Sequence, residues 1–429
     1  MNSKIILGSG LAGLSLSYFL KEKSIILEKE KQIGGLCRSF EFNGIFHDIG
    51  PHILFSKNKR VLSFVNSLAD ASKIRRSNKI FHKGRLIKYP FENDLASLSK
   101  EDRDYCLKEF LKNSYRSYNF HNMLQFFLKI YGEGITKLYL QPYNEKIWKF
   151  DPSFMDTQMV ERIPKPPKED VIKSAKGIET EGYIHQLYFN YPKKGGIQEI
   201  INNLTKKVAE KSKIINSIRI KRIYRKKRFW NIETNKGNFK SETLINCIPL
   251  HELFRYIKAP KNILTALSNL KYNSIYITTI SVKKDNIGNN FSLYFADPDV
   301  IFHRVSKLNF LGPNYSPKDK NTVLLVEVTY RPKSFLSTLS KDKIKRKILR
   351  DLDRLKIINK KDVTNINCKS FKYAYVIYDL DHRRNVDLIL KYLSRMEILC
   401  CGRFAEFEYL NMDRVIEHSR KLAKKLNKK

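Results

Sequence analysis

The chain has 429 residues, of which 42% are hydrophobic and 12% aromatic. This length exceeds the size at which a single hydrophobic core usually divides, so we expect two or three packed units. The formal net charge is +38, but the basic residues are scattered and accompany no nucleic-acid-binding motif, so nucleic acid is not an expected partner. A lysine-rich solvated surface is expected, with loose attraction to a membrane face or an anionic substrate as the alternative.

The cysteines and the apolar segments bound the cellular setting. Six cysteines show neither CxxC pairs nor the spacing of a disulfide framework, which indicates reduced thiols, a cytoplasmic location and no metal site. No apolar run reaches the roughly 18 residues of a transmembrane helix. The apolar N-terminus is interrupted by glycines, so it reads as the first strand and helix of the fold and not as a signal peptide.

The first 28 residues carry a dinucleotide-binding fingerprint. A strand over Lys4–Leu7 runs into GxGxxG, an apolar helix follows over Leu14–Leu20, and a second strand over Ser24–Leu27 ends at Glu28, eighteen residues after Gly10. In this context the glycines permit a tight turn, close approach of the backbone to a pyrophosphate and close helix–strand packing, while the carboxylate accepts ribose hydroxyls. The residues expected to meet the cofactor here are Gly8, Gly10, Leu11, Ala12, Gly13 and Glu28.

The next segment, Gly34-Gly35-Leu36-Cys37-Arg38, indicates which dinucleotide to expect. It resembles the E-(x)n-GG-x-x-R extension of the flavoprotein group that contains amine oxidases, protoporphyrinogen oxidases and UDP-galactopyranose mutases. The resemblance implies FAD and not NAD, with Gly34, Gly35 and Leu36 close to the cofactor and Arg38 at its phosphates. The alternative is a tight turn with a surface arginine. Phe46–Phe55 resembles the next FAD-proximal segment of that group, so His52 lies either near the flavin ring or packed in the core.

Residues from about 59 to 148 have helical spacing and few strand signals, which predicts an inserted helical subdomain. At its end, Tyr143 to Trp148 and the following Arg162 resemble the mutase pattern Y-T-x-K-Q-W with R-[IL]-P. The resemblance implies that Arg162 binds a substrate diphosphate and that Tyr143 and Trp148 line a nucleotide and sugar pocket. The alternative is that Trp148 anchors domain packing and Arg162 forms a helix-end salt bridge.

The resemblance implies that the chain then returns to the first domain, in the order expected for this flavoprotein group. Tyr188–Ile197 resembles its second glycine-pair segment, and a helix is predicted over Gln198–Val208. Three strands are predicted over Lys213–Ile223, Arg228–Glu233 and Lys240–Ile248, with Ile220 as a backbone contact for adenine. Farther on, Arg304 resembles the second diphosphate ligand of the mutases and Tyr375 a phosphate-binding phenol; alternating strand residues with an outward arginine are the alternative.

The C-terminal segment resembles the mutase ending G-R-x-x-x-x-x-Y-L-D-M-D. The resemblance implies that Gly402, Arg403 and a helix beginning near Met412 hold the flavin side of FAD, and that Tyr409 faces both cofactor and substrate. A helix N-terminus there would favour negative charge on the flavin. Three positions depart from the mutase pattern: Phe55, Ile147 and Ile197. They surround the sugar end of the pocket, and the stretch 165–187 is longer than its mutase counterpart.

Together these features predict an α/β protein. Its doubly wound, Rossmann-like FAD domain comprises 1–58, 193–250 and 395–429, its helical insertion 59–160, and its antiparallel-sheet substrate domain 161–192 and 251–394. The resemblance implies a flavoenzyme acting on a nucleotide diphosphate sugar for cell-surface polysaccharide synthesis, with reduced flavin N5 as the reactive atom and no protein nucleophile. The alternative is a net oxidoreductase of the amine oxidase or protoporphyrinogen oxidase type. A homo-oligomer and peripheral membrane contact stay open.

Overall fold

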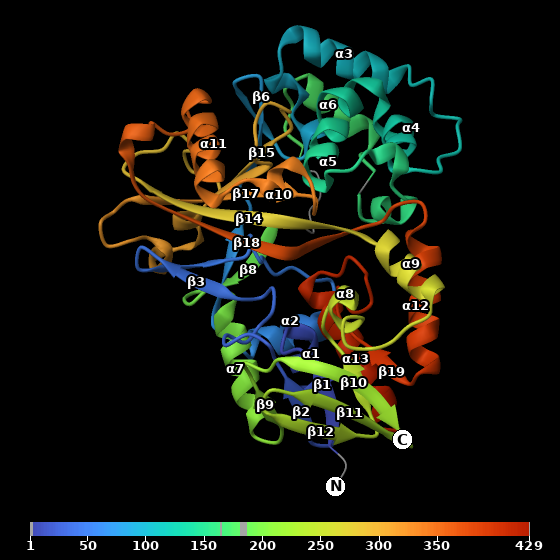
Figure 1. Ribbon diagram of the computed structural model, residues 1–429. Helices are drawn as coiled ribbons and strands as arrows, with labels where there is room; N and C mark the ends of the chain where they lie inside the picture. Colours follow the sequence, from blue (N-terminus) through green and yellow to red (C-terminus); the bar gives the residue numbers. More distant parts are fainter. Residues whose placement is uncertain (1–2, 164, 181–186, 429) are drawn as a thin grey trace.

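The computed structural model describes residues 3–163, 165–180 and 187–428. Its lower layer in Figure 1 is a five-stranded parallel sheet of order β19-β13-β1-β2-β9. The strands come from distant parts of the chain: β1 (Lys4–Leu7), β2 (Ser24–Leu27), β9 (Lys213–Ile215), β13 (Leu244–Asn246) and β19 (Ile398–Cys400). This sheet therefore joins the first, middle and last segments of the chain.

Both faces of the parallel sheet are covered, which is why its strands are apolar at successive positions. Ile6 and its neighbours face the helices α1 (Leu11–Phe19), α2 (Lys59–Asn66), α7 (Gln198–Ala209) and α13 (Met412–Leu426). Ile5 and Leu7 face the other way, into the same core as Trp230. Trp230 belongs to a three-stranded antiparallel sheet of β10 (Ile220–Lys226), β11 (Phe229–Thr234) and β12 (Gly237–Ser241).

A seven-stranded sheet of order β18-β14-β17-β16-β15-β6-β7 crosses the molecule above this layer (Figure 1). Its strands are β6 (Asn78–His82), β7 (Arg85–Lys88), β14 (Lys271–Val282), β15 (Ser292–Phe295), β16 (Arg304–Lys307), β17 (Thr322–Tyr330) and β18 (Val363–Ile377). The period of two along β14 puts Tyr276 and Ile280 against α11 (Lys341–Arg354) and puts Ile275 and Ile277 into a separate core on the opposite face.

A helical unit lies at the top of Figure 1. It contains α3 (Lys100–Leu111), α4 (Met123–Ile135), η3 (Thr136–Leu140), α5 (Gln141–Trp148) and α6 (Lys168–Ala175), with the short turns η1 (Phe91–Asn93), η2 (Leu95–Ser97), η4 (Pro152–Phe154) and η5 (Thr157–Arg162). The remaining strands and α-helices of the described residues are β3 (Ser39–Phe42), β4 (Ile45–Asp48), β5 (Ala71–Arg75), β8 (Tyr188–Pro192), α8 (Leu250–Leu253), α9 (Lys261–Asn269), α10 (Phe335–Thr338) and α12 (His382–Arg395).

The predicted α/β fold is confirmed, with a doubly wound parallel sheet and a second sheet that is antiparallel except where β6 pairs in parallel with β15. Several predicted elements differ in detail. The range 59–160 is not wholly helical, since it also contributes β5, β6 and β7. These strands mix charged and apolar residues, and their partners are distant: β5 pairs with β8 and β6 with β15. Conversely, α6 adds a helix within the stretch 161–192, where the sequence predicts part of the sheet domain.

Two of the predicted strands are also each divided by a turn. The span Lys213–Ile223 breaks between β9 and β10, where Ser217 adopts a φ of 53°. The span Lys240–Ile248 breaks after β12, where the Ser241 hydroxyl accepts a hydrogen bond from the Thr243 N–H at 3.0 Å. Local turns of this kind interrupt an apolar pattern that reads as continuous.

Candidate functional site

The turn between β1 and α1 forms the base of a cavity. Gly13 lies so close to this turn that an added Cβ would stand 2.1 Å from the Gly8 carbonyl oxygen. Gly8 has a φ of 96°, which favours glycine. The first turn of α1 therefore approaches the end of β1 closely and leaves its backbone open to a ligand, as a pyrophosphate requires.

Glu28 is held at the end of β2 beside this turn. Its Oε2 accepts hydrogen bonds from the N–H and the hydroxyl of Ser9, both at 2.8 Å, and its Oε1 accepts one from the Glu30 N–H at 2.9 Å. The residue is buried, yet it lines the cavity. A carboxylate fixed in this way is suited to accept hydrogen bonds from ribose hydroxyls.

The first cavity has a volume of about 390 Å³ and runs from Glu28 past the glycine turn to the start of α13. Arg38 is anchored along it by its Nε–H, which donates to the Gly35 carbonyl at 2.7 Å. Fourteen of the sixteen residues predicted to bind the cofactor line this cavity: Gly8, Gly10, Leu11, Ala12, Glu28, Gly34, Gly35, Leu36, Arg38, His52, Ile220, Gly402, Arg403 and Met412. Gly13 instead makes the close packing described above, and Tyr409 lines the neighbouring cavity.

One polar cluster on this cavity was missed by the sequence interpretation. Glu252 accepts hydrogen bonds from the Lys372 ammonium at 2.8 Å and from the Tyr373 hydroxyl at 2.7 Å, and all three residues line the cavity. Burial opposes ionisation of Glu252, but these two donors lower its pKa to about 2. Only the position of Glu252 in α8, six residues after the end of β13, could have pointed to it, because its partners are some 120 residues away.

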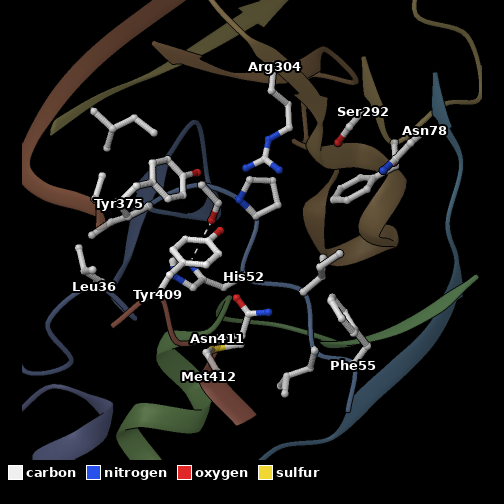
Figure 2. Close-up of a pocket in the computed structure, with 18 of the residues that line it drawn as sticks. Leu36, His52, Phe55, Asn78, Ser292, Arg304, Tyr375, Tyr409, Asn411 and Met412 are labelled. Carbon is white, nitrogen blue, oxygen red and sulfur yellow. Dashed lines mark hydrogen bonds between the residues drawn. The ribbon is translucent and has the colours of Figure 1, made fainter. Parts of the chain in front are cut away.

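A second cavity of about 250 Å³ adjoins the first (Figure 2). Leu36, His52, Arg403 and Met412 line both cavities, so they mark the junction. His52 Nδ1 lies 3.0 Å from the Gly50 carbonyl, which can only accept, so this nitrogen carries the proton. Burial and the nearby Arg403 lower the pKa of His52 to about 4, so the imidazole at the junction is neutral near pH 7.

Arg304 reaches into the second cavity from its upper side (Figure 2). Its Nε–H and an Nη2–H donate to the two carboxylate oxygens of Glu327, the latter at 2.8 Å. Glu327 is fully buried and stands directly opposite Arg304 in the β16–β17 register. Burial lowers the pKa of Arg304, but Glu327 outweighs it and raises that pKa well above its ordinary value. The guanidinium is therefore charged and fixed in orientation.

Aromatic rings form one wall of the second cavity. Tyr375 and Tyr409 line it with ring centres 6.0 Å apart, and Arg403 lies over the Tyr409 ring at 5.1 Å. Trp148 packs edge-on against both tyrosines from behind, at 5.8 and 5.6 Å, without lining the cavity itself. Its position is that of a packing anchor, as in the alternative interpretation. Burial raises the pKa of Tyr375, so its phenol keeps the proton it could donate.

The two other predicted substrate residues come from the helical unit: Tyr143 belongs to α5 and Arg162 to η5. Tyr143 stacks on Tyr139 at 5.3 Å and meets Tyr294 edge-on at 5.7 Å; Tyr294 lines the second cavity, whereas Tyr143 does not. Arg162 ends η5, but its side chain lies outside the described part of the structure. The sequence interpretation also missed polar residues that line the cavity and belong to no motif: Arg76, Asn78, Ser292 and Tyr294. Asn411 lines it too, and it lies within the C-terminal motif, where the mutase pattern has Asp.

Two negative observations complete the description of the site. Within residues 3–163, 165–180 and 187–428, no cluster of three or more His, Cys, Asp or Glu side chains is arranged to hold a metal ion. In the same described ranges, no helix has both the length and the apolar character needed to cross a membrane.

Comparison with known proteins finds sequence relatives among the sugar mutases. Residues 6–68 match the family model of the NAD(P)-binding Rossmann-like domain. The chain is 27% identical over 210 residues to dTDP-fucopyranose mutase of Escherichia coli, covering 45% of this chain and 55% of that enzyme. It is 25% identical over 175 residues to UDP-galactopyranose mutase of Mycoplasma genitalium, covering 37% and 43% respectively. The matches thus span about half the length of these relatives.

The likeness in fold extends over the whole chain. The structure of reduced UDP-galactopyranose mutase superposes with a TM-score of 0.90 and 22% identity, covering 99% of this chain and 95% of that one. Putrescine oxidase bound to putrescine superposes with a TM-score of 0.68 and 13% identity, covering 100% and 99%. The resemblance to the mutase and amine oxidase group, inferred from short motifs, is confirmed, and the mutase fold is the nearer of these two.

Proposed function

We propose that this protein is an FAD-dependent enzyme of the UDP-galactopyranose mutase type that acts on a nucleoside diphosphate sugar. The observation that carries the proposal is the junction of two cavities at Leu36, His52, Arg403 and Met412. One cavity follows the glycine turn between β1 and α1, and the other is lined by three arginines, Arg76, Arg304 and Arg403, and by three tyrosines, Tyr294, Tyr375 and Tyr409. A cofactor seated in the first would present its reactive ring to a ligand in the second.

The residues of the first cavity fit FAD. The close glycine turn leaves backbone exposed for a pyrophosphate, Glu28 is oriented for a ribose, and Arg38 supplies a nearby positive charge. The flavin, when bound in its reduced form, would supply a nucleophilic ring nitrogen for attack on the anomeric carbon of the sugar. Met412 begins α13 at the junction, and the positive end of that helix favours negative charge there.

The residues of the second cavity would bind and orient the substrate. Arg304 has one terminal nitrogen, Nη1, outside its two-point contact with Glu327, and this nitrogen is available to a phosphate oxygen. Tyr375 would donate its phenol proton to a second oxygen. The resemblance assigns Arg162 to the same diphosphate. The neutral His52 adds no positive charge that would compete for the phosphates at the junction.

The remaining expectations belong to this proposal. We place the reaction in the cytoplasm, in the supply of sugars for cell-surface polysaccharide, and we retain the division into a discontinuous FAD domain, a helical insertion and a sheet domain. A net oxidoreductase of the amine oxidase type is the second candidate. The specific observation in its favour is the whole-chain likeness to putrescine oxidase, and the lower TM-score of that likeness ranks it second.

The test is an anaerobic titration of the chemically reduced flavoprotein with UDP and, separately, with dTDP, followed by the flavin spectrum. We expect a saturable spectral change for at least one nucleotide, and an affinity at least tenfold lower in the Arg162→Ala variant. Active protein should then interconvert the pyranose and furanose forms of the matching nucleotide sugar. Absence of any spectral change in flavin-loaded wild-type protein, together with flavin reduction by an amine, would instead establish the oxidoreductase.

A further inference from the structure

A polar network behind the aromatic wall joins three segments of the chain. Arg383, on α12, donates from Nη2 to Glu408 at 2.7 Å and to the Gln158 side-chain oxygen at 2.9 Å. The other Glu408 oxygen accepts the hydroxyl of Tyr378, and that hydroxyl in turn accepts the backbone N–H of Tyr409 at 2.8 Å. One guanidinium thus connects η5, which carries Gln158, with the loop that carries Tyr409.

The segment leading into η5 is also aligned along the turn that follows β18. The Asp156 N–H donates to the Tyr378 carbonyl at 2.8 Å, and the Leu380 N–H donates to the Phe154 carbonyl at 3.2 Å. These backbone contacts set the start of η5, but they end before Gln158. η5 is a 3₁₀ helix of only six residues, and it buries Met159 and Val160 in the core. The side-chain contact from Arg383 adds a polar attachment at Gln158, beyond the backbone contacts.

The network lies outside the binding machinery. Gln158, Tyr378, Arg383 and Glu408 line neither of the two cavities. The Arg383 side chain is 41% exposed, so its removal leaves no large cavity in the core. Arg383 can therefore affect the site only through the two segments that it joins. These are η5, which ends at Arg162, and the loop that carries Tyr409.

We propose that Arg383 is a positioning residue that holds η5 and the Tyr409 loop in one relative arrangement, so that the end of η5 and Tyr409 keep a fixed position relative to the same nucleotide diphosphate. This inference rests on the proposed function, which assigns Arg162 to the diphosphate. Its physical basis is that misplacement of a binding group by about 1 Å can cost a large factor in affinity or rate. A planar guanidinium that bridges two acceptors restricts such movement more than a single contact would.

The neighbouring Arg384 provides a matched control. It lies on the same helix, is 75% exposed and pairs with Asp381 within the same helical turn. In the anaerobic UDP titration we expect Arg383→Ala to bind UDP about tenfold more weakly than wild type, with unchanged flavin content and flavin spectrum. Arg384→Ala should behave as wild type. Gln158→Ala, which removes only the η5 side of the bridge, should reproduce most of the loss and serves if Arg383→Ala folds poorly.

A double-mutant cycle with Arg162→Ala separates positioning from a general structural effect. If Arg383 acts through η5, its removal should weaken UDP binding by less than twofold when Arg162 is already absent. Fully additive losses would overturn the inference, as would UDP affinity within twofold of wild type in both Arg383→Ala and Gln158→Ala. A wild-type protein that binds neither UDP nor dTDP would overturn the proposed function first and this inference with it.

Discussion

Arg304 carries a positive charge into the second cavity because Glu327 faces it from the neighbouring strand. Two charges removed from water are tolerated when their geometry is good and their hydrogen bonds are satisfied. Gly50 lies against the same carboxylate, since a Cβ added there would stand 2.7 Å from Glu327 Oε1. The loop that carries Gly50 and His52 is therefore packed directly on this ion pair, so the stability of the fold and the lining of the second cavity depend on the same two residues.

We predict that Glu327→Ala lowers the free energy of unfolding by about 3–5 kcal/mol, because it leaves the Arg304 charge buried without its partner. Urea denaturation of flavin-saturated protein measures this change. Glu242→Ala is the control: Glu242 is 40% exposed and pairs with the largely exposed Arg228, so its loss should cost under about 1 kcal/mol. Equal costs for the two variants would contradict the prediction.

The Arg304–Glu327 pair also shows which residues of the site can be predicted from the sequence and which cannot. A motif resemblance singled out Arg304, and the GxGxxG and GG-x-x-R motifs singled out most of the first cavity, because each motif is local in sequence. Glu327 lies 23 residues after Arg304 on another strand, and only the β16–β17 register brings them together. No local pattern encodes that register, so neither Glu327 nor the Glu252–Lys372 pair could be assigned beforehand.

At the scale of elements, helical spacing correctly predicted α3, α4 and α5, whose apolar residues recur on one face. It did not predict how closely two of them pack. An added Cβ on Gly134 would lie 2.7 Å from the Cys106 Cα, and one on Gly132 would lie 2.4 Å from the Glu109 carbonyl oxygen. Two small residues thus let α3 and α4 approach with their backbones almost in contact.

We predict that Gly134→Ala destabilises the protein by about 1–3 kcal/mol, although alanine is the better helix former, because the obstructing atom is backbone and the two helices must separate. Thermal and urea unfolding report the change. Lys108→Ala, on the exposed side of α3, should stay within about 0.5 kcal/mol of wild type. A Gly134→Ala variant as stable as wild type would mean that α3 and α4 can move apart without cost.

At the scale of the whole molecule, the parallel sheet draws strands from residues 4–27, 213–246 and 398–400. Sequence motifs could order these segments, because each carries its own turn chemistry. They could not predict that β6 and β7 leave the helical region and complete the seven-stranded sheet, since that pairing is set by β15 more than 200 residues later. The junction of the two cavities is likewise a product of assembly, formed by residues near positions 36, 52, 403 and 412.

This assembly buries histidines in several layers, which makes stability depend on pH. Burial lowers the pKa of His47, His52 and His251 from 6.5 to about 4. The unfolded chain takes up protons below about pH 6.5, whereas the folded protein resists until about pH 4. The stability contributed by the neutral imidazoles is therefore present above pH 6.5 and is lost as the pH falls towards 4. Asp48, whose pKa burial raises to about 6, acts in the opposite direction for one proton.

Because three histidines oppose one aspartate, we predict that the free energy of unfolding falls between pH 7 and pH 5, by about 1.4 kcal/mol per pH unit for each net proton bound. Urea denaturation of flavin-saturated protein at several pH values measures the slope. His251 lines neither cavity, so His251→Gln should flatten the slope without loss of flavin, whereas His121→Gln, at an exposed position, should leave it unchanged. Stability that stays constant or rises on acidification would mean that these imidazoles are hydrated in the folded protein.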